Sequence, residues 1–255
     1  MVKGLEKFRA HFAGYADQYV LIGGTATFLA LSEAALQARA TKDLDIVLCV
    51  EALNPDFVAA FWAFVKEGAY ENRQRSTGER TFYRFDKPAD ETFPAMLELF
   101  SRKPDNLELD EAATLTPIPV DEDLSSLSAI LLDDDYYRFI HAHKKEIEGL
   151  PIVSEQCLIP LKARAWLDLT ARREAGAAID SKNINKHRGD VLRLSRLLVE
   201  GEEVRLPDRI RADMNSFLAA LEKQDGLDLK SMGLQGTTLP QLIGVLRSVF
   251  CRDGA

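Results

Sequence analysis

Residues 19–50 carry the pattern that most restricts what this chain can fold into: an apolar run, two glycines, an amphipathic stretch and a second apolar run that opens on two aspartates. Residues 19–22 predict a strand, and Gly23 and Gly24 permit the positive φ with which a chain passes at once from a strand into a helix. We expect Thr25 to cap that helix. Its hydroxyl and the free N–H groups of the first turn would form an anion-binding corner that suits a phosphate.

The second strand of this segment begins with two carboxylates. Residues 37–42 return the chain to the sheet, and residues 43–50 predict the strand. Because side chains alternate across a strand, Asp43 and Asp45 point to one face and Leu44 points to the other. Two carboxylates on one face supply the oxygen ligands that Mg²⁺ prefers. The alternative is an ordinary solvated strand end, because an Asp-x-Asp pair alone is a weak motif.

The glycine turn and the approach to the aspartates form one extended motif, Gly23-Gly24-Thr25 with Arg39-Ala40-Thr41-Lys42-Asp43-Leu44-Asp45. This motif resembles the signature of the minimal nucleotidyltransferase fold, in particular the branch that contains the abortive-infection type IV toxins. The resemblance implies an α+β protein, with a mixed sheet and flanking helices followed by a C-terminal helical bundle. It also implies an enzyme in which the glycine turn, Arg39 and Thr41 bind an NTP and the two aspartates hold Mg²⁺.

The resemblance requires a third acidic residue from a later strand, on the face of the two aspartates. Residues 93–102 predict such a strand, and Glu98 lies within it between Leu97 and Leu99. An acidic side chain among packed apolar residues is costly unless a metal or a partner compensates its charge. Glu98 is therefore the candidate for the third metal ligand, or for the base that accepts the proton of the attacking hydroxyl. The alternative is the polar edge of an ordinary half-buried strand.

Composition and charge favour a nucleotide as the partner. The chain has 255 residues and a net charge of −8, which argues against a protein whose whole surface binds nucleic acid. Cys49, Cys157 and Cys251 are too widely separated to indicate a zinc site or a disulfide framework. The N-terminal residues are mixed and charged, and no run approaches the ~20 apolar residues of a membrane span. We therefore expect a cytoplasmic protein without a membrane partner.

The second half of the chain has a helical pattern. Apolar periodicity predicts helices at about residues 154–174, 184–199, 207–223 and 238–251. Together with the resemblance, this predicts a nucleotidyltransferase core over residues 1–120, a connecting strand and helix segment over 121–153, and a helical domain over 154–255 that completes the cleft. Within the connecting segment, three consecutive aspartates, 133–135, indicate a turn or a helix start rather than a metal cluster.

Basic residues gather in the first two of these predicted helices. The stretches around Lys162 and Lys186 resemble helical motifs of the toxin branch, which implies that Lys162, Lys186 and Asp190 line the nucleotide cleft. Lys186 and Asp190 are four residues apart and share a helix face, so the alternative for this pair is an exposed ion pair. Lys162 lies in an apolar stretch, which favours a phosphate contact or a buried ion pair.

Three functions are consistent with the sequence. The first is a magnesium-dependent nucleotidyltransferase that moves a nucleoside monophosphate from an NTP to a hydroxyl of a tRNA end or of a protein side chain, as the toxin of a toxin–antitoxin pair with an antitoxin as partner. The second transfers the same group to a small molecule such as an aminoglycoside. The third is a nucleotide-binding module of the same fold without turnover. Loss of a carboxylate would mark the third function, and Asp43, Asp45 and Glu98 are all present.

Overall fold

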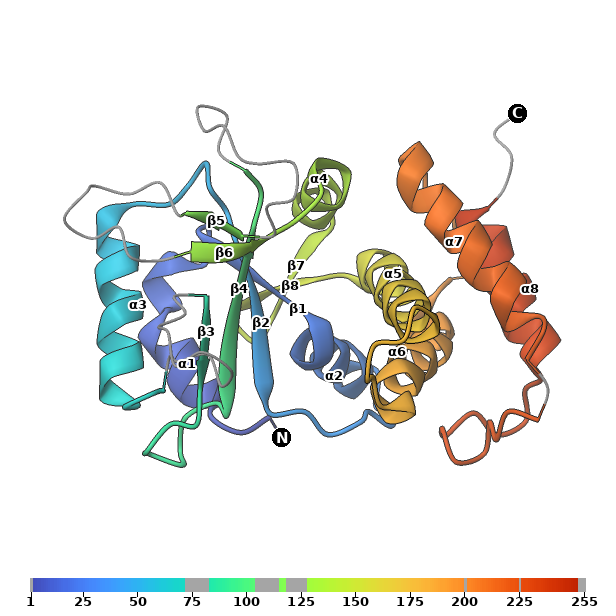
Figure 1. The fold of residues 1–255 in the computed structure, drawn as a ribbon, viewed down its shortest axis with the longest axis horizontal. Helices are drawn as coiled ribbons and strands as arrows, with labels where there is room; N and C mark the ends of the chain where they lie inside the picture. Colours follow the sequence, from blue (N-terminus) through green and yellow to red (C-terminus); the bar gives the residue numbers. More distant parts are fainter. Residues whose placement is uncertain are drawn as a thin grey trace. The chain divides into compact units, whose positions relative to one another are not determined.

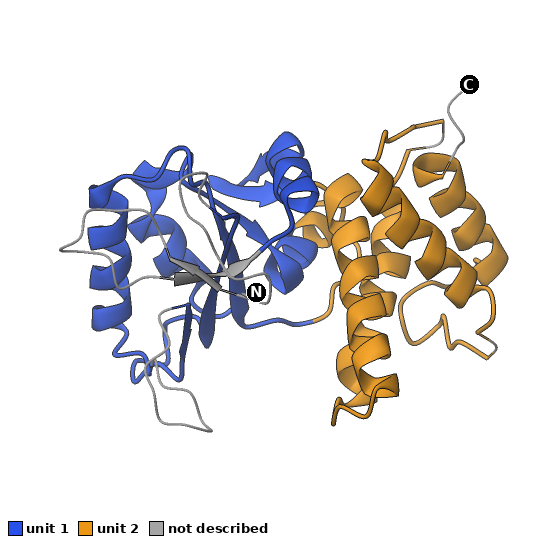
Figure 2. Ribbon diagram, turned by 45° about the horizontal axis from the view of Figure 1, so that its top comes forward, with its two compact units in different colours: residues 1–29, 40–153 blue, residues 30–39, 154–255 orange. Residues whose placement is uncertain are grey.

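The computed structural model describes residues 2–71, 83–103, 115–117, 128–199, 201–224 and 226–251. The chain divides into two compact units, shown in separate colours in Figure 2. We call residues 1–29 and 40–153 the sheet unit, and residues 30–39 and 154–255 the helical unit. The described part of segment 121–153, expected as a connector, clusters with the sheet unit. The acidic stretch at 107–123 lies outside the described residues except for 115–117.

The helices and strands of the described residues follow one another in a mixed order (Figure 1). In the first half of the chain they are α1 (Leu5–His11), η1 (Ala13–Tyr15), β1 (Tyr19–Ile22), α2 (Gly23–Glu33), β2 (Asp43–Leu48), α3 (Pro55–Glu67), β3 (Arg84–Asp86), β4 (Met96–Ser101) and β5 (Leu115–Pro117). In the second half they are β6 (Ser128–Leu131), α4 (Asp134–Ala142), β7 (Lys144–Ile147), β8 (Leu150–Val153), α5 (Glu155–Glu174), α6 (Ser181–Leu194), η2 (Ser195–Leu197), α7 (Asp208–Leu221) and α8 (Leu239–Phe250).

The eight described strands form one mixed sheet in the sheet unit. Its order is β5-β6-β4-β2-β1-β8-β7, and β3 pairs with the free part of the β4 edge. The β2–β4, β4–β6 and β1–β8 pairs are parallel, whereas β1–β2, β3–β4, β5–β6 and β7–β8 are antiparallel. A mixed sheet with helices around it and a helical segment after it confirms the predicted α+β class.

The core of the sheet unit is built on the buried central strands and a cluster of aromatic rings. All four residues of β1 are buried. Helices α1 and α3 lie on the same side of the sheet, and α2 lies on the other (Figure 1). The rings between α1, α3 and the sheet contact one another at centroid distances from 4.5 Å upward, and they belong to Phe8, Phe12, Tyr19, Phe57, Phe61 and Phe64. This dense packing holds β1 and β2, the two strands of the motif, in a rigid frame.

The helical unit contains the four helices that apolar periodicity predicts, α5 to α8. Trp166 of α5 packs edge-on against Phe217 of α7, with ring centroids 5.4 Å apart. Helix α8 begins with a capping box in which the Thr238 hydroxyl accepts from the backbone N–H of Gln241, and the Gln241 side chain accepts from the backbone N–H of Thr238. None of the helices in the described part of the chain is both long and apolar enough to span a bilayer.

Candidate functional site

The glycine turn and Asp45 are in direct contact in the sheet unit. Gly23 has a φ of +67°, and a Cβ atom at this position would lie 1.7 Å from Oδ2 of Asp45. Strand β1 ends beside β2 with Ile22 directly opposite Asp45, so the turn begins at the level of this carboxylate. Only glycine leaves room for the carboxylate at this distance and also adopts this φ without strain. The predicted phosphate corner and the predicted metal ligands are therefore neighbours.

Thr25 does not have the predicted role of helix cap. Helix α2 begins at Gly23, so Thr25 lies in its first turn, where it is fully buried. Its hydroxyl donates a hydrogen bond of 2.8 Å to the carbonyl oxygen of Asp43. The capping prediction is wrong because Gly23 itself reaches the helical turn directly from the strand. Thr25 instead ties the start of α2 to the first residue of β2, while Gly24 remains half-buried at the turn.

The acidic residues of the motif share one face of the sheet. Asp45 of β2 lies directly beside Glu98 of the parallel strand β4, and Arg84 of β3 lies beside Glu98 on its other side. Laterally paired residues point to the same face. Asp43, two residues before Asp45, joins them on that face. The register thus places Asp43, Asp45 and Glu98 together, as the sequence predicted, and adds an arginine that the sequence analysis missed.

Glu98 is paired with Arg84. Its residue exposure is 8%, and its Oε1 accepts from Nε of Arg84 at 2.7 Å and also from Nη2. Burial alone would lower the pKa of Arg84, but the charge and hydrogen bonds of Glu98 outweigh that effect and raise it. The alternative, the polar edge of an ordinary half-buried strand, does not describe Glu98, which is buried and paired with a cation.

A surface hollow of about 360 Å³ opens beside Asp43. Its charged lining residues are Lys3, Lys42, Asp43, Asp86, Lys87 and Glu91. Asp86 and Asp43 both lie beside Met96 in the sheet register, so Asp86 is a further carboxylate on the acidic face. The hollow is thus lined by both lysines and carboxylates, and Lys3 lies 3.7 Å from Glu91 while Lys87 pairs with Glu71.

The donor set on this face fits a magnesium ion held by two carboxylates. Within the described ranges, no three His, Cys, Asp or Glu side chains are grouped closely enough to hold a metal by themselves. Magnesium in nucleotide enzymes needs fewer protein ligands, because one or two carboxylates, water and the substrate phosphates complete its shell. Asp43 and Asp45 meet that requirement. Because Gly23 has no Cβ atom, the Asp45 carboxylate has room beside the backbone of the turn.

The helical unit contains a separate group of charged side chains around Asp190, which is 1% exposed. Nζ of Lys162, itself 4% exposed, lies 3.1 Å from Oδ2 of Asp190. Arg39 Nη2 lies 3.7 Å from the same oxygen, and Arg193 Nη1 lies 3.5 Å from Oδ1. Three cations thus converge on one buried carboxylate. The alternative of an exposed ion pair is wrong for Asp190, whereas the buried ion pair considered for Lys162 is present.

His187 lies on α6 close to this group of charged side chains. Its pKa is lowered to about 3, first because burial disfavours the charged imidazole and then because Lys162 and Lys186 add positive charge. Lys186 is half-buried on the same helix, α6. Burial is the larger of these effects, so His187 is neutral at physiological pH.

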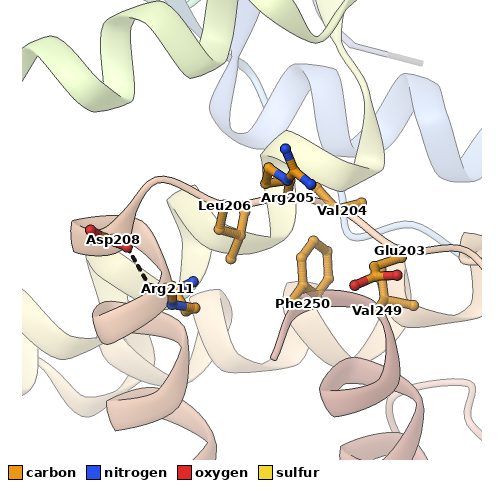
Figure 3. Close-up of a pocket in the computed structure, with 8 residues that line it drawn as sticks. All are labelled: Glu203, Val204, Arg205, Leu206, Asp208, Arg211, Val249 and Phe250. Atoms are coloured by element: carbon orange, nitrogen blue, oxygen red, sulfur yellow. Dashed lines mark hydrogen bonds and ion pairs between the residues drawn. The ribbon is translucent and has the colours of Figure 1, made fainter. Parts of the chain in front are cut away.

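A second hollow, of about 410 Å³, lies in the helical unit and is drawn in Figure 3. It is formed by the segment before α7, the start of α7 and the end of α8. Arg211 pairs there with Asp208, and the ring of Phe250 lies between Leu206 and Glu203 in that view. None of the predicted site residues lines it, and it takes no part in the proposed site.

The predicted site residues therefore fall into two groups. Gly23, Gly24, Thr25, Thr41, Asp43, Asp45 and Glu98 belong to the sheet unit, and Arg39, Lys162, Lys186 and Asp190 belong to the helical unit. The sequence analysis missed Arg84, Asp86 and Arg193, because each becomes relevant only through strand register or a tertiary contact. In comparisons with known proteins, no protein-family model, curated protein sequence or solved structure matches the chain.

Proposed function

We propose that the protein is a magnesium-dependent nucleotidyltransferase, which moves a nucleoside monophosphate from an NTP to an acceptor hydroxyl. The observation that carries this proposal is the contact between Gly23 and Asp45. It joins the positive end of a helix to an acidic face that also carries Asp43 and Glu98. A phosphate site beside paired carboxylates is the arrangement that phosphoryl-transfer chemistry with a divalent metal requires. The same contact supports our proposal that the sheet unit has the minimal nucleotidyltransferase fold.

Asp43 and Asp45 would hold the magnesium ion, whose charge would neutralise the triphosphate and favour departure of pyrophosphate. The backbone N–H groups at the start of α2 would bind phosphate oxygens, because they have no acceptor within the helix. Thr25 contributes by fixing the first turn of α2 to the backbone of Asp43. The protein's part in the reaction is then to orient the α-phosphate and the attacking hydroxyl in line.

Considering the helical unit alone, we assign the charged group around Asp190 to the binding of an anion. Lys162 and Asp190 form its buried base, and Arg39, Lys186 and Arg193 are its less buried cations. Three cations against one carboxylate leave positive charge in excess at this place, which supports the assignment. The acceptor in the toxin interpretation, a tRNA end, is itself anionic.

The proposal is tested by supplying each α-labelled NTP, with and without magnesium, together with total cellular RNA and a cell lysate. We expect magnesium-dependent label on RNA or on a protein, with release of pyrophosphate. Transfer to neither, but to an added aminoglycoside, would identify the small-molecule acceptor. If nucleotide binds in the presence of magnesium and no label moves to any acceptor, the protein is a binding module of this fold.

Asp45→Asn is the decisive variant, because it keeps the shape of the side chain and removes the charge that would hold the metal. We expect it to abolish transfer and magnesium-dependent nucleotide binding without unfolding the protein. Asp17→Asn is a matched control, since Asp17 is an exposed aspartate of the sheet unit before β1. Full transfer by Asp45→Asn would refute the assignment of the site, and absence of nucleotide binding by the unaltered protein would refute the function.

A further inference from the structure

We propose that Arg84 is a phosphate-binding residue that determines specificity for the nucleotide, and that Glu98 positions it rather than binding the metal. This inference rests on the proposed function and changes the role that sequence reasoning gave to Glu98. Its basis is the lateral row Asp45, Glu98 and Arg84, which runs across three neighbouring strands at one level of the sheet.

Glu98 is buried and forms a hydrogen-bonded ion pair with Arg84. Its Oε1 accepts two hydrogen bonds from the guanidinium, from Nε and from Nη2. The side chain of Glu98 is 11% exposed, whereas that of Arg84 is 50% exposed. Recruiting Glu98 to a metal would bring a divalent cation close to the guanidinium of Arg84, which is unfavourable because the two positive charges repel each other. Glu98 therefore anchors the inner edge of Arg84.

The outer part of Arg84 has the properties of a phosphate ligand. A guanidinium is a planar fork of N–H donors, and half of the Arg84 side chain is exposed to solvent. The fork matches the oxygens of a phosphate in a two-point contact that a lysine cannot make. Strand register places Arg84 on the same face of the sheet as Asp45. Arg84 and a metal held by Asp45 would therefore contact the same phosphate.

The charge of the carboxylates on this face also favours such a cation. Asp43, Asp45 and Asp86 are three carboxylates on one face, and a polyphosphate approaching them is repelled. Magnesium removes part of this repulsion. Arg84 supplies positive charge on the same row as Asp45. Its ion pair with Glu98 holds the guanidinium in position before the nucleotide binds. Preorganisation of this kind strengthens binding because less side-chain freedom is lost.

The test measures nucleotide binding and metal binding separately. Isothermal titration with ATP, ADP and AMP in excess magnesium gives nucleotide affinity, and Mn²⁺ titration followed by electron paramagnetic resonance, without nucleotide, gives metal affinity. For Arg84→Met we expect ATP affinity to fall roughly tenfold or more, AMP affinity to change less, and Mn²⁺ affinity to stay within about twofold. Arg84→Lys keeps the charge but not the fork, and should recover only part of the loss.

Glu98→Gln tests the positioning role. The amide removes the charge that holds Arg84 but keeps an acceptor, so ATP affinity should fall less than in Arg84→Met. The double variant should bind ATP no more weakly than Arg84→Met alone, since Glu98 acts through Arg84. Arg102→Met is the matched control: it breaks another Arg–Glu pair of the sheet unit, with Glu51, and should leave both affinities unchanged.

The outcomes separate this inference from the function on which it rests. If the unaltered protein binds ATP with magnesium but Arg84→Met and Arg84→Lys bind it equally well, the inference is refuted and the function stands. A large loss of Mn²⁺ affinity in Glu98→Gln would also refute it, because Glu98 would then be a metal ligand. If the unaltered protein binds neither ATP nor Mn²⁺, the proposed function itself fails. Circular dichroism of each variant establishes that it is folded.

Discussion

At the scale of single residues, Gly23 is where the backbone and the acidic face meet. Replacing it with alanine would place a methyl group onto the carboxylate of Asp45 and force a residue with a Cβ atom to keep a φ of +67°. We expect Gly23→Ala to lower the free energy of unfolding by more than the ~1–2 kcal/mol of a left-handed residue alone. It should also weaken Mn²⁺ binding by displacing Asp45.

Gly149 provides the control for this prediction. It has a similar φ, +77°, in the turn between β7 and β8, but a Cβ atom added there would meet no neighbouring atom within 4 Å. Gly149→Ala should therefore carry only the conformational cost and leave Mn²⁺ binding intact. Urea unfolding and Mn²⁺ titration of both variants provide the comparison. Equal losses of stability, with metal binding retained in both, would show that the contact with Asp45 is unimportant.

Asp190 is the second residue whose environment makes a sharp prediction. Removing its charge in Asp190→Ala leaves Lys162 buried without its counter-ion, and the loss of a partner from a buried ion pair costs about 3–5 kcal/mol. Replacing both in Lys162→Met with Asp190→Leu should recover much of that stability, because two apolar side chains need no counter-ion. Urea unfolding measures both changes. A double variant no more stable than Asp190→Ala would contradict this explanation.

At the scale of elements, helix ends show how local chemistry stabilises the helical unit. The capping box at Thr238 satisfies N–H groups at the start of α8 that the helix leaves without acceptors. Thr238→Ala should lower the free energy of unfolding by about 1 kcal/mol. Ser216→Ala is the control, since Ser216 is exposed within α7 and its hydroxyl donates only to the carbonyl of Ala212. Equal effects in urea unfolding would argue against the cap.

The sequence predicted most elements because their signals are local. Apolar periodicity and helix-start residues indicated α5 to α8. Helix α3 has a local start signal of the same kind, because the Asn54 side chain accepts from Phe57 N–H. Asp133 begins α4 as an N-cap, as expected for a helix start. The strand–turn–helix–strand segment was also predicted, although α2 begins three residues earlier than a Thr25 cap implies.

The parts that the sequence did not reveal depend on distant pairing. Arg84 follows a polar stretch without periodicity, and its importance arises only because β3 pairs with β4 in a register that places it beside Glu98. Arg193 is one of many basic residues on α6 until the fold brings it within 3.5 Å of Asp190. No spacing rule along the chain encodes either contact. Glu98 was identified, but its partner could not be.

At the scale of the whole molecule, each unit carries a histidine that resists protonation. The pKa of His141 in the sheet unit is lowered to about 4, first by burial and then by the charge of Lys144. The pKa of His187 in the helical unit is lowered to about 3. Both values lie below the ordinary 6.5, so between about pH 3 and 6.5 the unfolded chain binds protons that the folded chain does not. Stability should therefore rise with pH across this window and be lost as the pH falls.

Urea unfolding from pH 5 to 7 tests this expectation where most carboxylates are already ionised. His187→Gln cannot take up the proton in either state, so its stability should depend less on pH than that of the unaltered protein. His141→Gln should act similarly through the sheet unit. His11→Gln is the control, at a half-buried histidine whose ring is hydrogen-bonded to the carbonyl oxygen of Ala60. An unchanged slope in His187→Gln would contradict the linkage.

The division of the chain has a consequence for its inheritance. Residues 30–39, at the end of α2 and in the loop after it, cluster with residues 154–255 rather than with their neighbours in sequence. A gene cut at codon 153 would yield a second fragment without a segment that supplies Arg39 to Asp190. Recombination could therefore not exchange either unit as an uninterrupted cassette.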